Sequence, residues 1–367
     1  MKFSLFYEIP VAKPWSRDSE LRAYHETLVQ AVEADRRGWH GFWTVEHHFL
    51  EEFSHCSNPE VLYGAVAAKT ENLRIGYGVR LQPQPYNHPV RSAESVAVLD
   101  LISNGRVDYG TGRSTTRIEL EGFGIHPNQT REMWRESVET TIGCWVNDEY
   151  EFEGKYWQMP RRRVLPKPIQ DPHPPVFGAT GSRDGHTMMG ELGLGLCSFS
   201  LGTPIEELKH HLSVYREASD NCTAPLGSTV NNQTIVFAMV NCAPSTEQSF
   251  EVAKPNFEWY VERSTEIIGE LPRWLEELET PDASYDYLER SRRAVDKGRH
   301  REVTFESLLD MGAVISGNPD EVGEQCQAFK DAGADVLLCL LNPYNVSHES
   351  SMQTIDLMSR HVLPQFT

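Results

Sequence analysis

Three titratable side chains, Glu46, His47 and His48, follow one another directly after the run GFWTV at residues 41–45. Aromatic and β-branched residues favour a strand, so these side chains are expected at a strand's carboxyl end. Imidazole titrates near neutral pH, and a histidine in that position can act as a general base or a hydrogen-bond donor. The alternative is one buried, hydrogen-bonded histidine and one surface histidine.

A metal site built from these three side chains is not expected. Neighbours in a strand point to opposite faces, which would place Glu46 and His48 on one face and His47 on the other. No HExxH motif is present. The seven cysteines are scattered and form no CxxC pair, so neither a disulfide framework nor a zinc site is predicted. Reduced thiols of a cytoplasmic protein are the expectation.

Two loops of small residues could bind an anion. In GTGRS at 110–114, glycines allow close backbone approach and Arg113 could grip a phosphate with two hydrogen bonds. In GATGSRDG at 178–185, Gly181 and Ser182 stand at the start of a predicted helix, where amides attract anions. The alternatives are an arginine paired with a surface carboxylate and a serine that only caps the helix. Together the loops predict a phosphate site.

Glycine is also dense in the run Gly76-Tyr77-Gly78-Val79, which ends another predicted strand. A glycine inside a strand often marks the close approach of backbone to a ligand. The alternative is a β-bulge.

Strands and helices alternate along the chain with short connections, which is typical of a parallel sheet with crossover helices. Helices are predicted, for example, over 16–38, 130–146 and 245–263. Eight such strands in 367 residues predict an α/β fold, a (β/α)8 TIM barrel with insertions. The predicted strands are 3–8, 41–45, 73–79, 106–110, 176–179, 195–197, 235–241 and 335–341.

Two stretches exceed the needs of a barrel. Residues 150–175 are rich in proline and are predicted to form an excursion outside it. Residues 265–309 are charged and long enough to form an active-site lid. Because no stretch reads as a domain linker, residues 1–367 are predicted to form one domain.

The formal net charge of −19 argues against nucleic acid or an anionic membrane surface as a partner. No apolar run approaches the ~20 residues that a membrane span needs. The amino-terminal apolar run is broken by Glu8 and Pro10, too soon for a signal peptide. A cytoplasmic location is therefore expected.

At this point a set of motifs resembles the bacterial luciferase-like flavin-dependent monooxygenases. Any one motif is weak, but the set keeps the family's order and covers nearly the whole chain. It comprises GFWTVEHHF at 41–49, Asn58-Pro59, HPVR at 88–91 with Leu99-Asp100, SNGRV at 103–107, the 110–114 loop, PHPPV at 172–176 and GNPDEV at 317–322.

The resemblance implies a (β/α)8 barrel that takes reduced FMN (FMNH2), usually from a separate NAD(P)H:flavin reductase. Members bind O2 as a flavin C4a-(hydro)peroxide and oxidise a small organic substrate. It implies that His47 is the catalytic histidine beside the flavin, for which a neutral-range pKa is suitable, with Glu46 and His48 as supporting neighbours. It also implies a mobile lid at 265–309 and a homodimer packed through the helices after the early strands.

The resemblance further assigns the cofactor site. It places Arg113 and Ser182, beside Gly181, on the FMN phosphate. It places Gly78 and Val79 where the family often has a non-proline cis peptide under the isoalloxazine. A second phosphate-binding hydroxyl of the family meets Gly185 here. Two other functions stay open, an F420-dependent hydride-transfer oxidoreductase of the same superfamily and a non-catalytic luciferase-like partner subunit.

Overall fold

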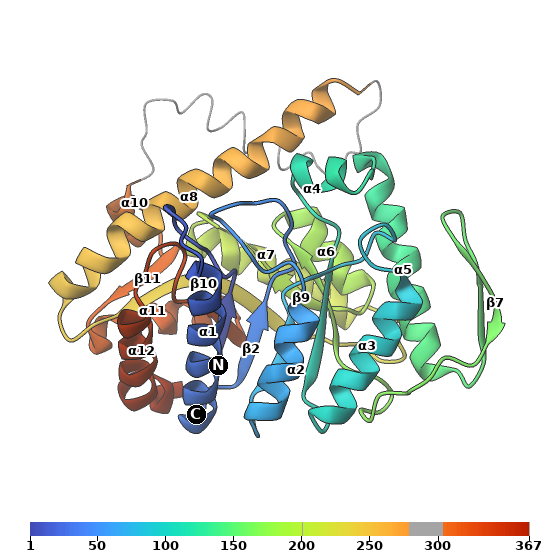
Figure 1. Cartoon of the computed structure of the whole chain (residues 1–367), viewed down its shortest axis with the longest axis horizontal. Coiled ribbons are helices and arrows are strands. Elements are labelled where there is room, and N and C mark those ends of the chain that lie inside the picture. Colours follow the sequence, from blue (N-terminus) through green and yellow to red (C-terminus); the bar gives the residue numbers. More distant parts are fainter. Residues whose placement is uncertain (200, 279–303, 367) are drawn as a thin grey trace.

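The fold is a closed barrel of eight parallel strands, seen in a computed structural model that describes residues 1–199, 201–278 and 304–366 (Figure 1). Each strand pairs with the next along the chain, and the last pairs with the first. The predicted fold is confirmed. The barrel strands are β1 (Lys2–Tyr7), β2 (Gly41–Thr44), β3 (Arg74–Tyr77), β5 (Val107–Gly112), β8 (Val176–Thr180), β9 (Gly195–Ser198), β10 (Thr234–Cys242) and β12 (Val336–Leu340).

The strands are buried on both faces, as expected when helices cover a parallel sheet. All nine residues of β10 are buried, and the two halves of this strand have different neighbours. The first half lies between β9 and β12. The second half, from Met239 to Cys242, pairs with a further strand, β11 (Val314–Gly317). The sequence analysis did not predict β11. A two-residue strand, β4 (Arg80–Leu81), also adds to β5.

Helices surround the barrel (Figure 1). None of the helices in the described ranges is long and apolar enough to cross a membrane. The α-helices are α1 (Ser19–Arg36), α2 (Pro59–Lys69), α3 (Pro89–Ile102), α4 (Arg117–Gly122), α5 (Thr130–Val146), α6 (Arg183–Glu191), α7 (Ile205–Asp220), α8 (Thr246–Glu276), α10 (Phe305–Asp310), α11 (Pro319–Ala332) and α12 (His348–Leu357).

Helix starts follow local side-chain chemistry in most places. Ser182 and Ser245 accept hydrogen bonds from the backbone amides three residues on, and Asn318 forms a capping box with Glu321. Asn58, in the predicted N-cap and proline pair, makes no such side-chain bond, although Pro59 does begin α2.

The proline-rich stretch forms a hairpin outside the barrel, as predicted. Its strands, β6 (Tyr150–Glu153) and β7 (Gln158–Arg162), pair only with each other in an antiparallel sheet. Figure 1 shows this hairpin projecting beyond α5 at the side of the molecule.

Helix α8 corrects the predicted helix end at 263 and extends into the first part of the predicted lid. The helix continues to Glu276, with Pro255 and Pro272 inside it. Its last turns pack against α4, through a separate apolar cluster of Leu120, Ile125, Leu271 and Leu275. Tertiary burial therefore sustains a helix that composition alone did not indicate. Residues 279–303 of the predicted lid lie outside the described part of the chain.

Candidate active site

One cavity of about 450 Å³ lies at the carboxyl ends of the barrel strands. This size is typical of a small-molecule site, and this end of a (β/α)8 barrel is where active sites form. Much of its lining comes from residues that directly follow strands: Glu8 after β1, His47 after β2, Gly78 and Val79 after β3, Arg113 after β5, Gly181 and Ser182 after β8, and Phe199 after β9.

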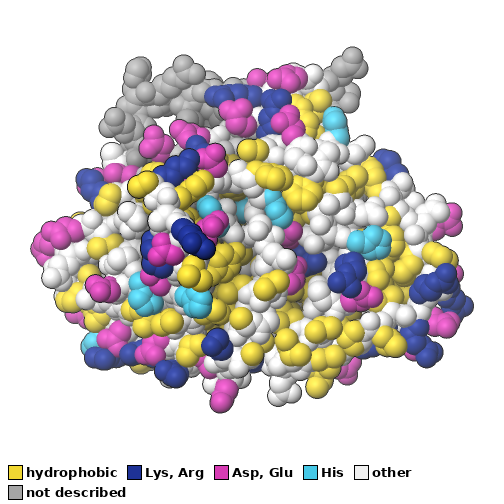
Figure 2. Space-filling view, viewed as in Figure 1, with side chains coloured by type: hydrophobic (Ala, Val, Ile, Leu, Met, Phe, Trp, Pro, Cys, Tyr) yellow, Lys and Arg dark blue, Asp and Glu magenta, His cyan; other side chains and the backbone are white. Residues whose placement is uncertain are grey.

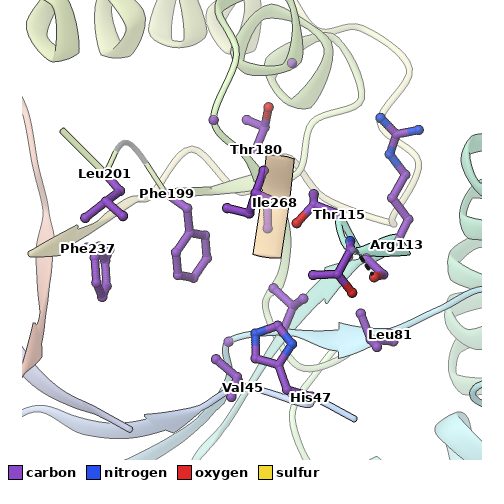
Figure 3. Close-up of a pocket in the computed structure, with 18 of the residues that line it drawn as sticks. Val45, His47, Leu81, Arg113, Thr115, Thr180, Phe199, Leu201, Phe237 and Ile268 are labelled. Carbon is purple, nitrogen blue, oxygen red and sulfur yellow. Dashed lines mark hydrogen bonds between the residues drawn. The ribbon is translucent and has the colours of Figure 1, made fainter. Parts of the chain in front are cut away.

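His47 enters this cavity from a loop, because β2 ends at Thr44. Its Nδ1 lies 3.0 Å from Oε1 of Glu119, a fully buried residue of α4. With Nδ1 engaged, Nε2 is the ring nitrogen left for a ligand. Figure 3 shows the ring between the side chains of Val45 and Leu81, directed at the centre of the pocket.

The pair with Glu119 sets the charge of His47. Burial alone would lower the pKa of His47, but the Glu119 carboxylate beside it raises that pKa to about 9. Burial alone would raise the pKa of Glu119, yet the imidazolium and its hydrogen bond keep it below the ordinary value. His47 is therefore a cation at neutral pH, which corrects the expected neutral-range pKa.

Glu119 is held by four donors. Besides His47, its Oε1 accepts the backbone N–H of His48 at 2.9 Å. Its Oε2 accepts the hydroxyls of Ser114 at 3.0 Å and Thr116 at 2.5 Å. A buried carboxylate with this many donors is fixed in place and stays ionised.

The side chains of Glu46 and His48 bond to other groups than the His47 ring, although the Glu46 charge also raises the pKa of His47. Glu46 accepts the backbone N–H of Leu81 at 2.9 Å and the side-chain amide of Asn87 at 2.8 and 2.9 Å. His48 Nε2 lies 3.3 Å from Glu46 Oε1. Glu46 lines the cavity together with His47, so the predicted division by strand alternation does not hold in this loop, which begins after Thr44. Glu46 fixes β4 to the β2 loop.

Between β3 and β4, the peptide bond Gly78–Val79 is cis, at the position that the resemblance indicated. Gly112 makes room beside it, because a Cβ there would lie 2.4 Å from Cγ2 of Val79. Because Gly112 has no side chain, β5 can lie close to the cis peptide. Both Gly78 and Val79 line the cavity.

Arg113, Gly181 and Ser182 line the cavity, as the sequence predicted for a phosphate site. Arg113 donates from one terminal nitrogen to Thr130 Oγ1 at 3.3 Å. Ser182 caps α6, accepting from the amide of Gly185 at 3.1 Å. A Cβ at 185 would lie 1.9 Å from Thr180 Oγ1, so the Thr180 hydroxyl fills the space of a side chain there.

The other side of the cavity is aromatic. Phe53 and Phe237 contact the ring of Tyr260, with centroids 5.0 and 6.2 Å apart. Figure 3 shows Phe237, Phe199 and Leu201 grouped on one side of the pocket and Arg113 on the other. The cavity thus joins a polar, cationic end to an apolar, aromatic end.

Glu8 places a carboxyl group at the aromatic end of the cavity. It is 4% exposed, and its Oε1 accepts the hydroxyl of Tyr260 at 2.5 Å. Its Oε2 has no hydrogen-bond partner among the described residues. Burial raises the pKa of Glu8 to about 7, although His47 and the Tyr260 hydroxyl act to lower it.

Residues 1–336 match the model of the luciferase-like monooxygenase family. The chain belongs to this family. A luciferase-like monooxygenase from Acinetobacter baylyi, the oxygenase component of flavin-dependent trigonelline monooxygenase, is 30% identical over 222 residues. The match spans 60% of this chain and 60% of that relative.

Solved structures agree with the family's fold. The oxygenating constituent of 3,6-diketocamphane monooxygenase from Pseudomonas putida, in complex with FMN, has a TM-score of 0.77 and 22% identity, covering 100% of this chain and 99% of that one. An F420-dependent secondary alcohol dehydrogenase has a TM-score of 0.71 and 18% identity, with 100% and 99% covered.

Three residues of this luciferase-like monooxygenase site were missed from the sequence. Glu119 and Tyr260 lie far along the chain from the groups they bond, and no local pattern marks them. Arg131 also lines the cavity. Arginine is unfavourable in the first turn of a helix, where Arg131 stands in α5, and that could have marked it. Among the described residues, no cluster of His, Cys, Asp and Glu could hold a metal ion.

Proposed function

We propose that the chain is the oxygenase of a two-component system that uses reduced FMN and O2 to oxidise a small organic substrate. A separate NAD(P)H:flavin reductase would supply the FMNH2. The observation that carries the proposal is a single cavity in which the His47 imidazolium stands between a cationic end and an aromatic end. One end suits a phosphate and the other an apolar substrate.

The residues present fit FMN. Arg113, Ser182 and the first amides of α6 would hold the phosphate. Arg131 would add a second positive charge. The cis peptide Gly78–Val79, with the space left by Gly112, would receive the flat ring system. Reduced FMN, when bound, supplies the electrons and the carbon at which O2 is activated.

The chain itself would position a proton and keep water out of the cavity. His47 would offer a proton from Nε2 while Glu119 holds Nδ1. Ile267 and Ile268 of α8 line the cavity with the aromatic side chains and would exclude water from the reacting oxygen. A lid within 265–309 stays a prediction.

The F420-dependent alternative shares this fold, and the partner-subunit alternative would not need a complete cavity. That Arg113 and His47 line the same cavity supports the oxygenase. FMNH2 titration under anaerobic conditions separates the alternatives. We expect FMNH2 to bind, and binding of reduced F420 in its place would overturn the proposal.

Arg113→Ala tests the phosphate end. We expect FMNH2 affinity to fall about 10- to 100-fold, as for loss of a charged hydrogen-bonding partner. The matched control is Arg161→Ala, because Arg161 lies on the exposed hairpin strand β7. If both variants bind FMNH2 as tightly as the native chain, Arg113 does not hold the phosphate.

We also propose a homodimer formed through α2 and α3. Large apolar side chains are exposed on these helices, namely Val61, Val98, Leu101 and Ile102. Figure 2 shows hydrophobic side chains gathered over the lower part of this face, where Figure 1 places the two helices. Val61→Lys with Ile102→Lys should give a monomer by light scattering. An unchanged mass of two chains would contradict this interface.

A further inference from the structure

The unpartnered oxygen of Glu8 is the feature of the cavity that the proposed function leaves unused. Glu8 follows β1 directly, lines the cavity and is 4% exposed. Its Oε1 is occupied by the Tyr260 hydroxyl, while Oε2 has no donor in the described ranges of the chain. Leaving a buried carboxylate oxygen without a donor is costly, so such a group in a cavity indicates a ligand that supplies one.

The charges around Glu8 favour a positive ligand. His47 is the nearest cation, but it is already paired with Glu119, so that pair has no net charge. Of the two arginines in the described lining, Arg113 stands on the opposite side of the pocket (Figure 3), and Arg131 donates to the Met188 sulfur. An ionised Glu8 therefore leaves the aromatic end with one uncompensated negative charge.

The side chains beside Glu8 suit the same ligand. The rings of Tyr260, Phe53 and Phe237 form a connected wall, with neighbouring centroids 5.0 and 6.2 Å apart. All three line the cavity with Glu8. Aromatic faces attract cations and also pack against flat apolar bodies.

We infer that Glu8, positioned by Tyr260, is the receptor for a cationic nitrogen of the substrate, and that the substrate is a compact aromatic or apolar ammonium compound. The inference rests on the proposed function, because the bound cation would be the molecule that is oxidised. The raised pKa of Glu8 agrees with a carboxyl group that lacks its partner, and a bound cation would return it to the ionised form.

Three probes with one ring test the inference by calorimetry at pH 7.5 on the full chain: benzylammonium, benzyl alcohol and benzoate. We expect benzylammonium to bind at least about tenfold more tightly than the other two, the gain of a charge-assisted hydrogen bond. Glu8→Gln keeps the size of the side chain and should abolish this preference. Glu324→Gln, on the exposed face of α11, makes the same change of charge and should keep it.

The pH dependence of the native chain gives a second measurement that needs no variant. Benzylammonium affinity should fall as pH is lowered through about 7, where Glu8 takes up a proton, while benzyl alcohol affinity stays level. The other titratable groups that act on Glu8 are His47, Glu119 and Tyr260. His47 stays protonated and Glu119 ionised across that range.

Three outcomes would overturn the inference: no preference for benzylammonium in the native chain, an unchanged preference in Glu8→Gln, or equal loss of all three probes in that variant. Failure of the proposed function would look different. FMNH2 affinity depends on the Arg113 end, so it should be unchanged in Glu8→Gln. In the native chain, FMNH2 binding without a preference for benzylammonium would refute the role of Glu8 alone, whereas failure to bind FMNH2 would refute the proposed function.

Discussion

Two of the carboxylates that act on the His47 imidazole, Glu119 and Glu8, come from different elements and have different environments. Glu119, on α4, is fully buried and receives four hydrogen bonds. Glu8, after β1, is almost as buried but receives one side-chain hydrogen bond. The pKa of Glu119 is lowered and the pKa of Glu8 is raised to about 7. The His47 charge and the larger number of donors, and not the degree of burial, lower the pKa of Glu119 relative to that of Glu8.

The difference separates two tasks. A carboxylate with all its acceptors filled can orient His47 and hold its charge, but it has nothing left to offer a ligand. A carboxylate with an open oxygen is destabilised in the empty cavity, and a suitable ligand relieves that cost. Glu119 and Glu8 are therefore expected to respond differently to substitution and to pH.

The largest expected effect is on stability, from Glu119→Ala. Removing one partner of a buried ion pair should lower the free energy of unfolding by about 3–5 kcal/mol. Glu8→Ala should cost less, since it strands only the Tyr260 hydroxyl, a loss of about 1–3 kcal/mol. Urea unfolding at pH 7.5 measures both. A larger loss for Glu8→Ala would reverse the comparison.

His47→Gln should slow the oxidation of bound FMNH2 by O2 about 100-fold, the usual effect of losing one oriented donor at a developing anion. Stopped-flow absorbance follows this reaction without a known substrate. FMNH2 affinity should be nearly unchanged. A normal rate in this variant would show that the Glu119–His47 pair is structural only.

The pH dependence of stability should differ in sign for the two groups. The pKa of Glu8 rises on folding from 4.5 to about 7, so its favourable contribution is present below 4.5 and is lost up to about 7. The stability of Glu8→Gln relative to the native chain should therefore increase over that range. Glu119 has a lowered pKa, so its contribution is present above 4.5 and is lost in more acidic solution. Unfolding curves from pH 4 to 8 test the prediction for Glu8, and their extension below pH 4 tests the prediction for Glu119.

The smallest expected effect is that of Tyr260→Phe. Loss of its hydroxyl removes the only side-chain donor that the described residues give Glu8, so the pKa of Glu8 should rise further. The stability cost should be about 1 kcal/mol. NMR titration of the Glu8 carboxyl signal measures this shift in Tyr260→Phe. The same Glu8 signal in Tyr24→Phe is the control. A lowered pKa would contradict the assigned hydrogen bond.

The barrel could be predicted because its signals are local. Each strand is a short apolar run, and each crossover helix has its own start and stop residues. The cis bond at Gly78–Val79 followed from ordered family motifs and is observed. Strand β11 was missed because only Val314 and Ile315 of its four residues are apolar, and the helix cap Asn318 directly follows its last residue, Gly317. Its pairing with the far half of β10 decides it.

The candidate site was predicted only where a residue carries a motif. His47 and Arg113 stand in such motifs and line the cavity. Glu119 stands 72 residues from His47, on a short helix whose sequence has no recognisable pattern. The pKa of His47 could not be foreseen without that contact. The end of α8 was misjudged because burial against α4, not propensity, extends it.

The apolar cluster between α4 and α8 has a consequence for how the two carboxylates communicate. Helix α8 carries Tyr260, which bonds Glu8, and its last turns grip α4, which carries Glu119. One helix, interrupted in its hydrogen-bond ladder at Pro272, therefore links the residue that bonds Glu8 to the helix that carries Glu119. A ligand that displaced Tyr260 would also act, through α8 and this cluster, on the support of Glu119 beside His47.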